Sequence, residues 1–207
     1  MLFRSQGRTT GVVLESGDGV TQVMPIYEGY SLPNTAEKCD LGGSDITTYL
    51  RLLLKRSGHN FNTPSELEIL KAAKESIISC KPNSIEDEGN QKKKEDEGQS
   101  KPYALPDGTL INIGSEKTKA AEIMFKPSTI GFEGPGVHQL IFDSVKRADM
   151  DLRDSLYKNI VLAGGNTNIS GFLDRLSKEM TQIIAKSNSV VNFLSQRSRF
   201  TLETIAS

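Results

Sequence analysis

The stretch of residues 159–165 constrains the fold of this chain more than any other. Residues 160–163 are all apolar, which is typical of a strand buried on both faces, and Gly164-Gly165 ends the run. Apolar residues then recur at helical spacing from Ile169 to Ile184. Predicted strands and helices are mixed in this way along the whole chain, which favours an α/β or α+β fold.

The first eighty residues predict a β-hairpin followed by two helices. Residues 11–15 and 20–26 are strand-like, and a Ser-Gly-Asp-Gly turn at 16–19 joins them. Ser44 is the expected cap of a helix that ends at Ser57-Gly58. Thr63-Pro64-Ser65-Glu66 is a capping box for a second helix, which we expect to extend to about Cys80.

The remaining elements are predicted from similar patterns. We expect two short strands within 103–113, helices at about 135–148 and 150–158, and a last strand at 190–194. Between Pro82 and Lys101 the composition changes to six acids, four lysines and one apolar residue. Such a stretch buries too little apolar surface to offset its ordering entropy, so it predicts a disordered charged loop at 82–101.

Composition excludes several classes of protein. The chain has 25 Lys and Arg against 26 Asp and Glu, so its net charge of −1 does not favour nucleic acid or anionic membrane as a partner. No apolar run reaches the roughly 18–20 residues of a membrane span, and the N-terminus does not resemble a signal peptide. The two cysteines, Cys39 and Cys80, lack companions at metal-ligand spacing and indicate reduced thiols.

Two glycine-rich segments can carry chemistry. The turn at 16–19 and the loop that starts at Gly164-Gly165 can both present backbone N–H groups to an anion without a Cβ in the way. Each alone is more often a structural turn or a tight connection. In the same way, Lys71, Lys74 and Glu75 are most simply interpreted as the solvated face of the second predicted helix.

A series of longer motifs changes this balance. The strings GRTTGVVLESGDGVTQ (7–22), PIYEGY (25–30), DLGGSD (40–45), YALPDG (103–108), FKPSTIG (125–131) and NIVLAGG (159–165) follow one another in a fixed order. In sequence and order they closely resemble actin and the actin-related proteins over about residues 4–181. Residues 149–153 and 159–162 resemble centractin more than conventional actin, whereas 163–167 is similar to the nuclear actin-related subunits of chromatin remodellers.

The resemblance implies an actin-like, ribonuclease H-like α/β fold of which this chain is one large lobe. Residues 1–43 and 133–207 would form its core subdomain and 44–132 an inserted, smaller one. In this family two such lobes hold ATP or ADP with Mg²⁺ between them. The implied nucleotide-binding residues are Gly17, Asp18, Gly19, Gly43, Lys71, Lys74, Glu75, Gly164, Gly165, Asn166, Ile169 and Arg199.

Two departures from the family pattern affect the expected activity. Glu15 stands where the family has an aspartate near the metal, and Mg²⁺ with its strict octahedral shell tolerates the longer side chain poorly. Gln22 replaces a histidine that helps to position the attacking water. The chain also aligns from near the middle of an actin, so half of the nucleotide site is expected to be missing. We therefore expect weak ATP binding and no appreciable turnover by this chain alone.

Two functions remain open on the sequence. The first is a partial ATP-binding subunit of a cytoskeletal filament or complex, located in the cytoplasm, with actin-like protomers or other complex subunits as partners. The second is a non-catalytic actin-like interaction module, such as a nuclear chromatin-remodelling subunit. Neither requires direct contact with nucleic acid or membrane.

Overall fold

A computed structural model describes residues 9–81, 101–104, 110–184 and 193–195 of the chain. Residues 82–100 of the predicted charged loop lie outside the described residues, while Lys101 begins strand β5. None of the described helices is both long and apolar enough to cross a bilayer.

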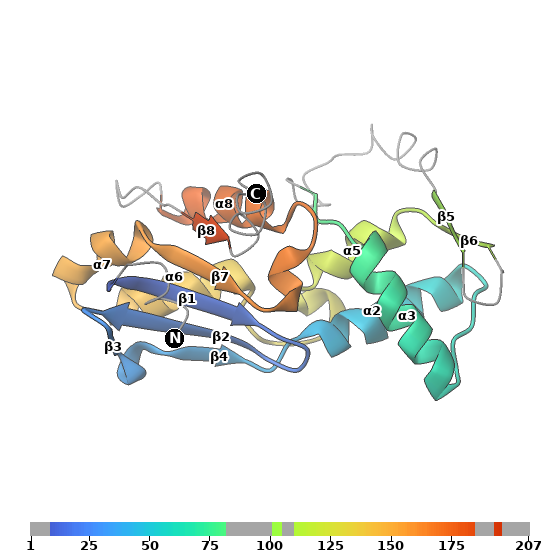
Figure 1. The fold of residues 1–207 in the computed structure, drawn as a ribbon, viewed down its shortest axis with the longest axis horizontal. Coiled ribbons are helices and arrows are strands. Elements are labelled where there is room, and N and C mark those ends of the chain that lie inside the picture. Colours follow the sequence, from blue (N-terminus) through green and yellow to red (C-terminus); the bar gives the residue numbers. More distant parts are fainter. Residues whose placement is uncertain (1–8, 82–100, 105–109, 185–192, 196–207) are drawn as a thin grey trace, which may run out of the picture.

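A mixed six-stranded sheet forms one half of the molecule (Figure 1). Its main path runs β3-β2-β1-β7-β8, and β4 also pairs with β2. Strands β1 and β2 form the predicted antiparallel hairpin, in which Ser16 faces Thr21, while β1 pairs in parallel with β7. The strands are β1 (Gly11–Ser16), β2 (Thr21–Tyr27), β3 (Tyr30–Ser31), β4 (Glu37–Cys39), β7 (Ile160–Ala163) and β8 (Phe193–Ser195).

Three helices accompany this sheet. Helix α6 (Val137–Arg147) packs against β1, β2 and β4, α7 (Met150–Tyr157) contacts β1 and β2, and α8 (Phe172–Ile184) packs on α6 and β8. All four residues of β7 are buried, as the apolar run predicts. Because β1 and β7 are parallel neighbours, the segments that follow them emerge at the same end of the sheet.

The other half of the molecule consists of α2 (Gly43–Arg56), α3 (Pro64–Ile77), α5 (Glu116–Glu122) and a hairpin of β5 (Lys101–Ala104) with β6 (Leu110–Ile113) (Figure 1). Helix α2 contacts both α3 and α5. One hydrophobic cluster extends through both halves, from Leu14 in β1 to Leu50 in α2 and Phe172 in α8. Short 3-10 turns complete the chain at Pro33–Thr35, Pro127–Ile130 and Gly165–Asn168.

Most predicted elements are confirmed, with several corrections. Gly42, not Ser44, is the N-cap of α2, because the Ser44 N–H and hydroxyl both donate to the Asp18 carbonyl at 2.8 and 3.0 Å. Helix α3 has the predicted Thr63–Glu66 capping box but ends at Ile77, before Cys80. Helix α8 begins at Phe172, since the 3-10 turn Gly165–Asn168 occupies the start of the expected helix. Helix α5 and strands β3 and β4 were not expected.

Candidate functional site

The turn between β1 and β2 is held in place by two distant parts of the chain. The Gly17 N–H donates to the Val20 carbonyl and closes the turn. The Gly17 carbonyl accepts from the Gly43 N–H at 3.0 Å and from Asn166 Nδ2 at 2.7 Å. The turn is therefore fixed between the N-terminus of α2 and the loop that follows β7.

The start of α2 approaches the turn too closely for a side chain. A Cβ on Gly42 would lie 2.2 Å from the Asp18 carbonyl oxygen, so only glycine fits. A Cβ on Gly43 would lie 3.0 Å from Asp18 Oδ1 and from Asn166 Oδ1, and 3.1 Å from Lys74 Nζ. Three polar side chains from three separate segments thus converge over the backbone of Gly43.

Helix α3 supplies the charged wall of the site. Lys74 is 7% exposed, and its Nζ donates to the Gly43 carbonyl at 2.9 Å. Burial lowers the pKa of Lys74, while the nearby carboxylates of Asp18 and Glu75 oppose that shift. Lys71 Nζ lies 3.8 Å from Asp18 Oδ2 in a half-exposed ion pair, which contributes little to stability. The expectation of a wholly solvated helix face is therefore wrong for Lys74.

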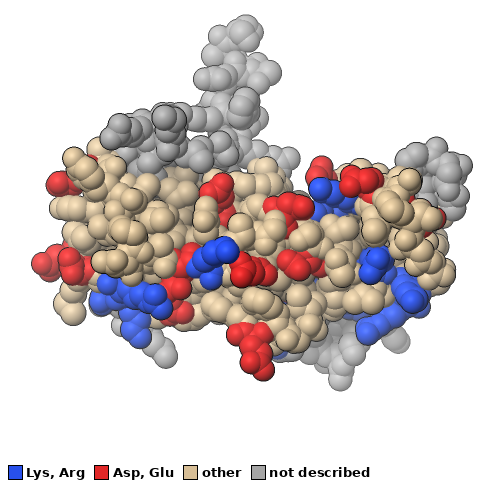
Figure 2. Space-filling view, turned by 90° about the horizontal axis from the view of Figure 1, so that it is seen from below, with Lys and Arg blue, Asp and Glu red and all other residues tan. Residues whose placement is uncertain are grey.

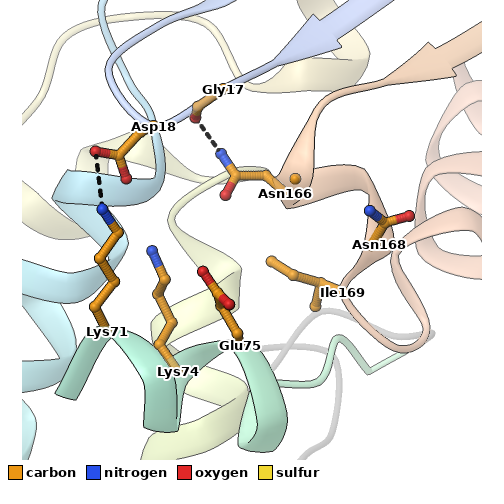
Figure 3. Close-up of a pocket in the computed structure, with 9 residues that line it drawn as sticks. Gly17, Asp18, Lys71, Lys74, Glu75, Asn166, Asn168 and Ile169 are labelled. Carbon is orange, nitrogen blue, oxygen red and sulfur yellow. Dashed lines mark hydrogen bonds and ion pairs between the residues drawn. The ribbon is translucent and has the colours of Figure 1, made fainter. Parts of the chain in front are cut away.

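The loop after β7 forms the opposite wall. Gly164 has φ 90° and lies against the backbone of Ser16, where a Cβ would be 2.2 Å from the carbonyl oxygen. This contact brings the end of β7 beside the end of β1. Asn166 then donates to Ser16 Oγ at 3.0 Å as well as to Gly17. Figure 3 shows Ile169 pointing from this loop toward Glu75 on α3.

These walls enclose a pocket of about 370 Å³ (Figure 3). It is lined by Gly17, Asp18, Lys71, Lys74, Glu75, Gly165, Asn166, Asn168 and Ile169. Its size falls in the range of about 300–1,000 Å³ that small-molecule and cofactor sites occupy. A Cβ on Gly19 or Gly165 would meet nothing within 4 Å, so the backbone there is open to a ligand. Open glycine backbone with two lysines suits an anionic ligand such as a nucleotide.

The pocket gathers most of the predicted site residues, and the remaining ones lie as follows. Gly43 lies close to the Asp18 and Asn166 side chains, and Gly164 lies against the backbone of Ser16. Gly19 lies in the turn beside the lining residues Gly17 and Asp18. Arg199 lies outside the described residues. Asn168 also lines the pocket but was not predicted. Its position directly before Ile169, in the same loop, could have indicated it.

The carboxylates around the pocket offer little for a metal ion. Glu15 does not line the pocket, and its Oε2 accepts a hydrogen bond from Gln22 Nε2 at 2.8 Å. Within the part of the chain that the structure describes, no group of three His, Cys, Asp or Glu side chains could hold a metal ion. These residues therefore do not form a protein cage for Mg²⁺, which in nucleotide sites is commonly held by substrate phosphates and water with one or two carboxylates.

Comparison with known proteins places this chain in a family. The model of the Actin family matches residues 2–202. An actin-like protein of Neurospora crassa is 46% identical over 184 residues, which is 88% of this chain and 48% of that protein. The chain thus spans about half the length of the curated relative it matches. Because the family model and the relative both cover most of the chain, it belongs to the actin family, and its α/β fold is that of an actin-like ATPase lobe.

Proposed function

We propose that this actin-related chain is a nucleotide-binding lobe that binds ATP or ADP in the pocket between the β1–β2 turn, α3 and the loop after β7. The observation that carries the proposal is the convergence of Asp18, Lys74 and Asn166 over Gly43, beside open glycine backbone. Amide donors and lysines would contact the phosphates, and Glu75 would bind hydroxyl groups of the sugar.

The 207 residues alone are expected to bind ATP weakly. Both lysines of the pocket already have partners within the chain, Lys71 with Asp18 and Lys74 with the Gly43 carbonyl. A phosphate must compete with these contacts, and the pocket has no metal-binding cluster of its own among the described residues. Calorimetric titration with Mg-ATP tests this, and sub-micromolar binding would contradict it.

A matched pair of variants locates the binding site. Lys71→Ala removes a pocket cation and should weaken Mg-ATP binding. Lys55→Ala removes an exposed cation from α2, which lines no part of the pocket, and should leave binding unchanged. Equal effects of the two substitutions would show that the nucleotide is attracted by general charge only, and the pocket assignment would be wrong.

We further propose that the chain alone does not turn over ATP and acts through assembly with partner proteins. The observation that favours this is the hydrogen bond between Gln22 and Glu15, since it engages both side chains with each other. Phosphate release assays test the proposal; steady release that is lost in Glu15→Ala would overturn it.

The partners we propose are actin-like protomers or other subunits of a cytoskeletal complex in the cytoplasm, with a nuclear remodelling complex as the alternative setting. On the face seen in Figure 2, acidic groups lie among the basic ones, which does not favour nucleic acid. We also propose residues 44–132 as an inserted subdomain and residues 1–43 and 133–207 as the core. Co-sedimentation with actin filaments, with and without Mg-ATP, tests the partner class.

A further inference from the structure

A buried arginine on α8 joins three segments of the chain behind the pocket. Arg175 is 2% exposed, and its guanidinium donates to both carboxylate oxygens of Glu122 on α5, at 2.8 and 3.2 Å. It also donates to the Lys81 carbonyl at 3.3 Å and to Glu179 on its own helix at 2.8 Å. Its carbon Cζ lies 5.0 Å from the ring centroid of Phe125. Few side chains other than arginine can make all of these contacts at once.

The segment that contains Lys81 is the continuation of α3. Just before it, the Cys80 N–H donates to the Ser170 carbonyl at 2.7 Å, and Ser79 forms a parallel bridge with Ser170. A Cβ on Gly171, which has φ 78°, would lie 2.3 Å from the Cys80 carbonyl oxygen. The chain after α3 therefore lies backbone to backbone against the chain after the pocket loop.

Both walls of the pocket end at this contact. One wall is α3, whose last lining residue, Glu75, lies six residues before Lys81. The other is the loop after β7, whose last lining residue, Ile169, lies six residues before Arg175. The distance between the walls is thus set where residues 79–81 meet residues 170–175.

We propose that Arg175 is a positioning residue for the pocket: through Glu122 and the Lys81 carbonyl it holds the α3 wall at the spacing that the ligand needs. Arg175 itself is not one of the residues that line the pocket. The effect on nucleotide affinity rests on the proposed function, whereas the effect on wall spacing does not. If loss of Arg175 leaves the walls correctly spaced one tenth of the time, apparent affinity falls about tenfold.

The test separates positioning from stability. Arg175→Met alone would take the guanidinium away from the buried Glu122 carboxylate and could unfold the chain. The double variant Arg175→Met/Glu122→Leu removes both charges, which commonly preserves stability, but it also removes the bond to Lys81. Glu179→Gln is the matched control, because it weakens the ion pair within α8 and keeps the Arg175 bonds to Glu122 and Lys81.

Three measurements on the full 207-residue chain decide the matter: urea unfolding, exchange of the Cys80 amide proton, and titration with Mg-ATP followed by NMR. We expect the double variant to exchange the Cys80 amide at least about tenfold faster and to bind Mg-ATP about tenfold more weakly at preserved stability. Glu179→Gln should match the unsubstituted chain in both.

Each contrary result has one meaning. If the stable double variant keeps both the original Cys80 exchange and the original affinity, Arg175 has no positioning role and the inference is wrong. If the unsubstituted chain binds no Mg-ATP, the proposed function fails, and Cys80 exchange alone then decides the positioning role. Faster exchange in the double variant supports that role, and unchanged exchange overturns it.

Discussion

Gly164 provides the sharpest test of how the pocket is built. Its φ of 90° and ψ of 158° belong to a backbone region that is essentially restricted to glycine, and a Cβ there would lie 2.2 Å from the Ser16 carbonyl oxygen. The strained backbone should cost about 1–3 kcal/mol. Relief of the steric overlap should cost a further amount of about 1–3 kcal/mol. We therefore expect Gly164→Ala to lower the free energy of unfolding by at least about 2 kcal/mol.

Gly165 offers a matched control one residue away. A Cβ there would meet nothing within 4 Å, and its φ is not in the left-handed region. Gly165→Ala should therefore change stability little, or raise it by up to about 1 kcal/mol through the unfolded state. Because Gly165 lines the pocket, its added methyl group should instead weaken Mg-ATP binding.

Urea unfolding followed by circular dichroism distinguishes the two variants. With a slope of about 2 kcal/mol per molar urea, the expected loss for Gly164→Ala moves the midpoint by about 1 M or more. The midpoint for Gly165→Ala should stay close to that of the unsubstituted chain. Equal midpoints for both variants would refute the claim that close approach of Gly164 to Ser16 holds β7 against β1 at the pocket.

Three further predictions concern single side chains. Thr63→Ala removes the capping box of α3 and should cost about 1 kcal/mol, seen as a lower midpoint of thermal unfolding, while Thr48→Ala on α2 serves as a threonine control. Burial lowers the pKa of His138 below its ordinary 6.5, so the unfolded chain takes up the proton first and stability falls as pH drops through and below that value. Thermal unfolding of His138→Phe should depend less on pH between about 7.5 and 5, and an unchanged dependence would contradict the assignment. Burial lowers the pKa of Lys74 from 10.5, and a bound phosphate would raise it again, so Mg-ATP binding at alkaline pH should take up protons. Calorimetry in two buffers of different ionisation enthalpy measures this uptake, which Lys74→Met should abolish.

Local signals were sufficient for several elements of the fold. The β1–β2 hairpin follows from two strand-like segments around a Ser-Gly-Asp-Gly turn, and α3 follows from Thr63 and Glu66, whose side chains satisfy the first N–H groups of the helix. These interactions join residues close in sequence, so sequence patterns predict them well. The pocket residues followed from the family resemblance, because the segments that meet there are far apart in the chain.

Long-range contacts account for what sequence reasoning missed. The sequence places Lys74 on the polar face of a helix, among other charged residues. Its Nζ nevertheless donates to the carbonyl of Gly43, which is 31 residues away in the sequence. Helix α5 is short and shows no clear apolar stripe, and Glu122 is buried there because Arg175 is its partner. Serine is a common N-cap residue, but the N–H and the hydroxyl of Ser44 both donate to the Asp18 carbonyl. In each case a distant partner outweighs the local preference.

The parallel pairing of β1 with β7 has a consequence for how the pocket forms. Asn166 bonds to Gly17 across a sequence separation of 149 residues, so the two glycine loops meet only after the chain between them has been brought together. Contacts of such long sequence separation form slowly, since loop closure must precede them. During synthesis the β1–β2 hairpin and α2 emerge from the ribosome long before β7 can join them. We therefore expect the pocket to be among the last parts of the described fold to assemble, and a ligand that binds it would selectively stabilise chains that have completed folding.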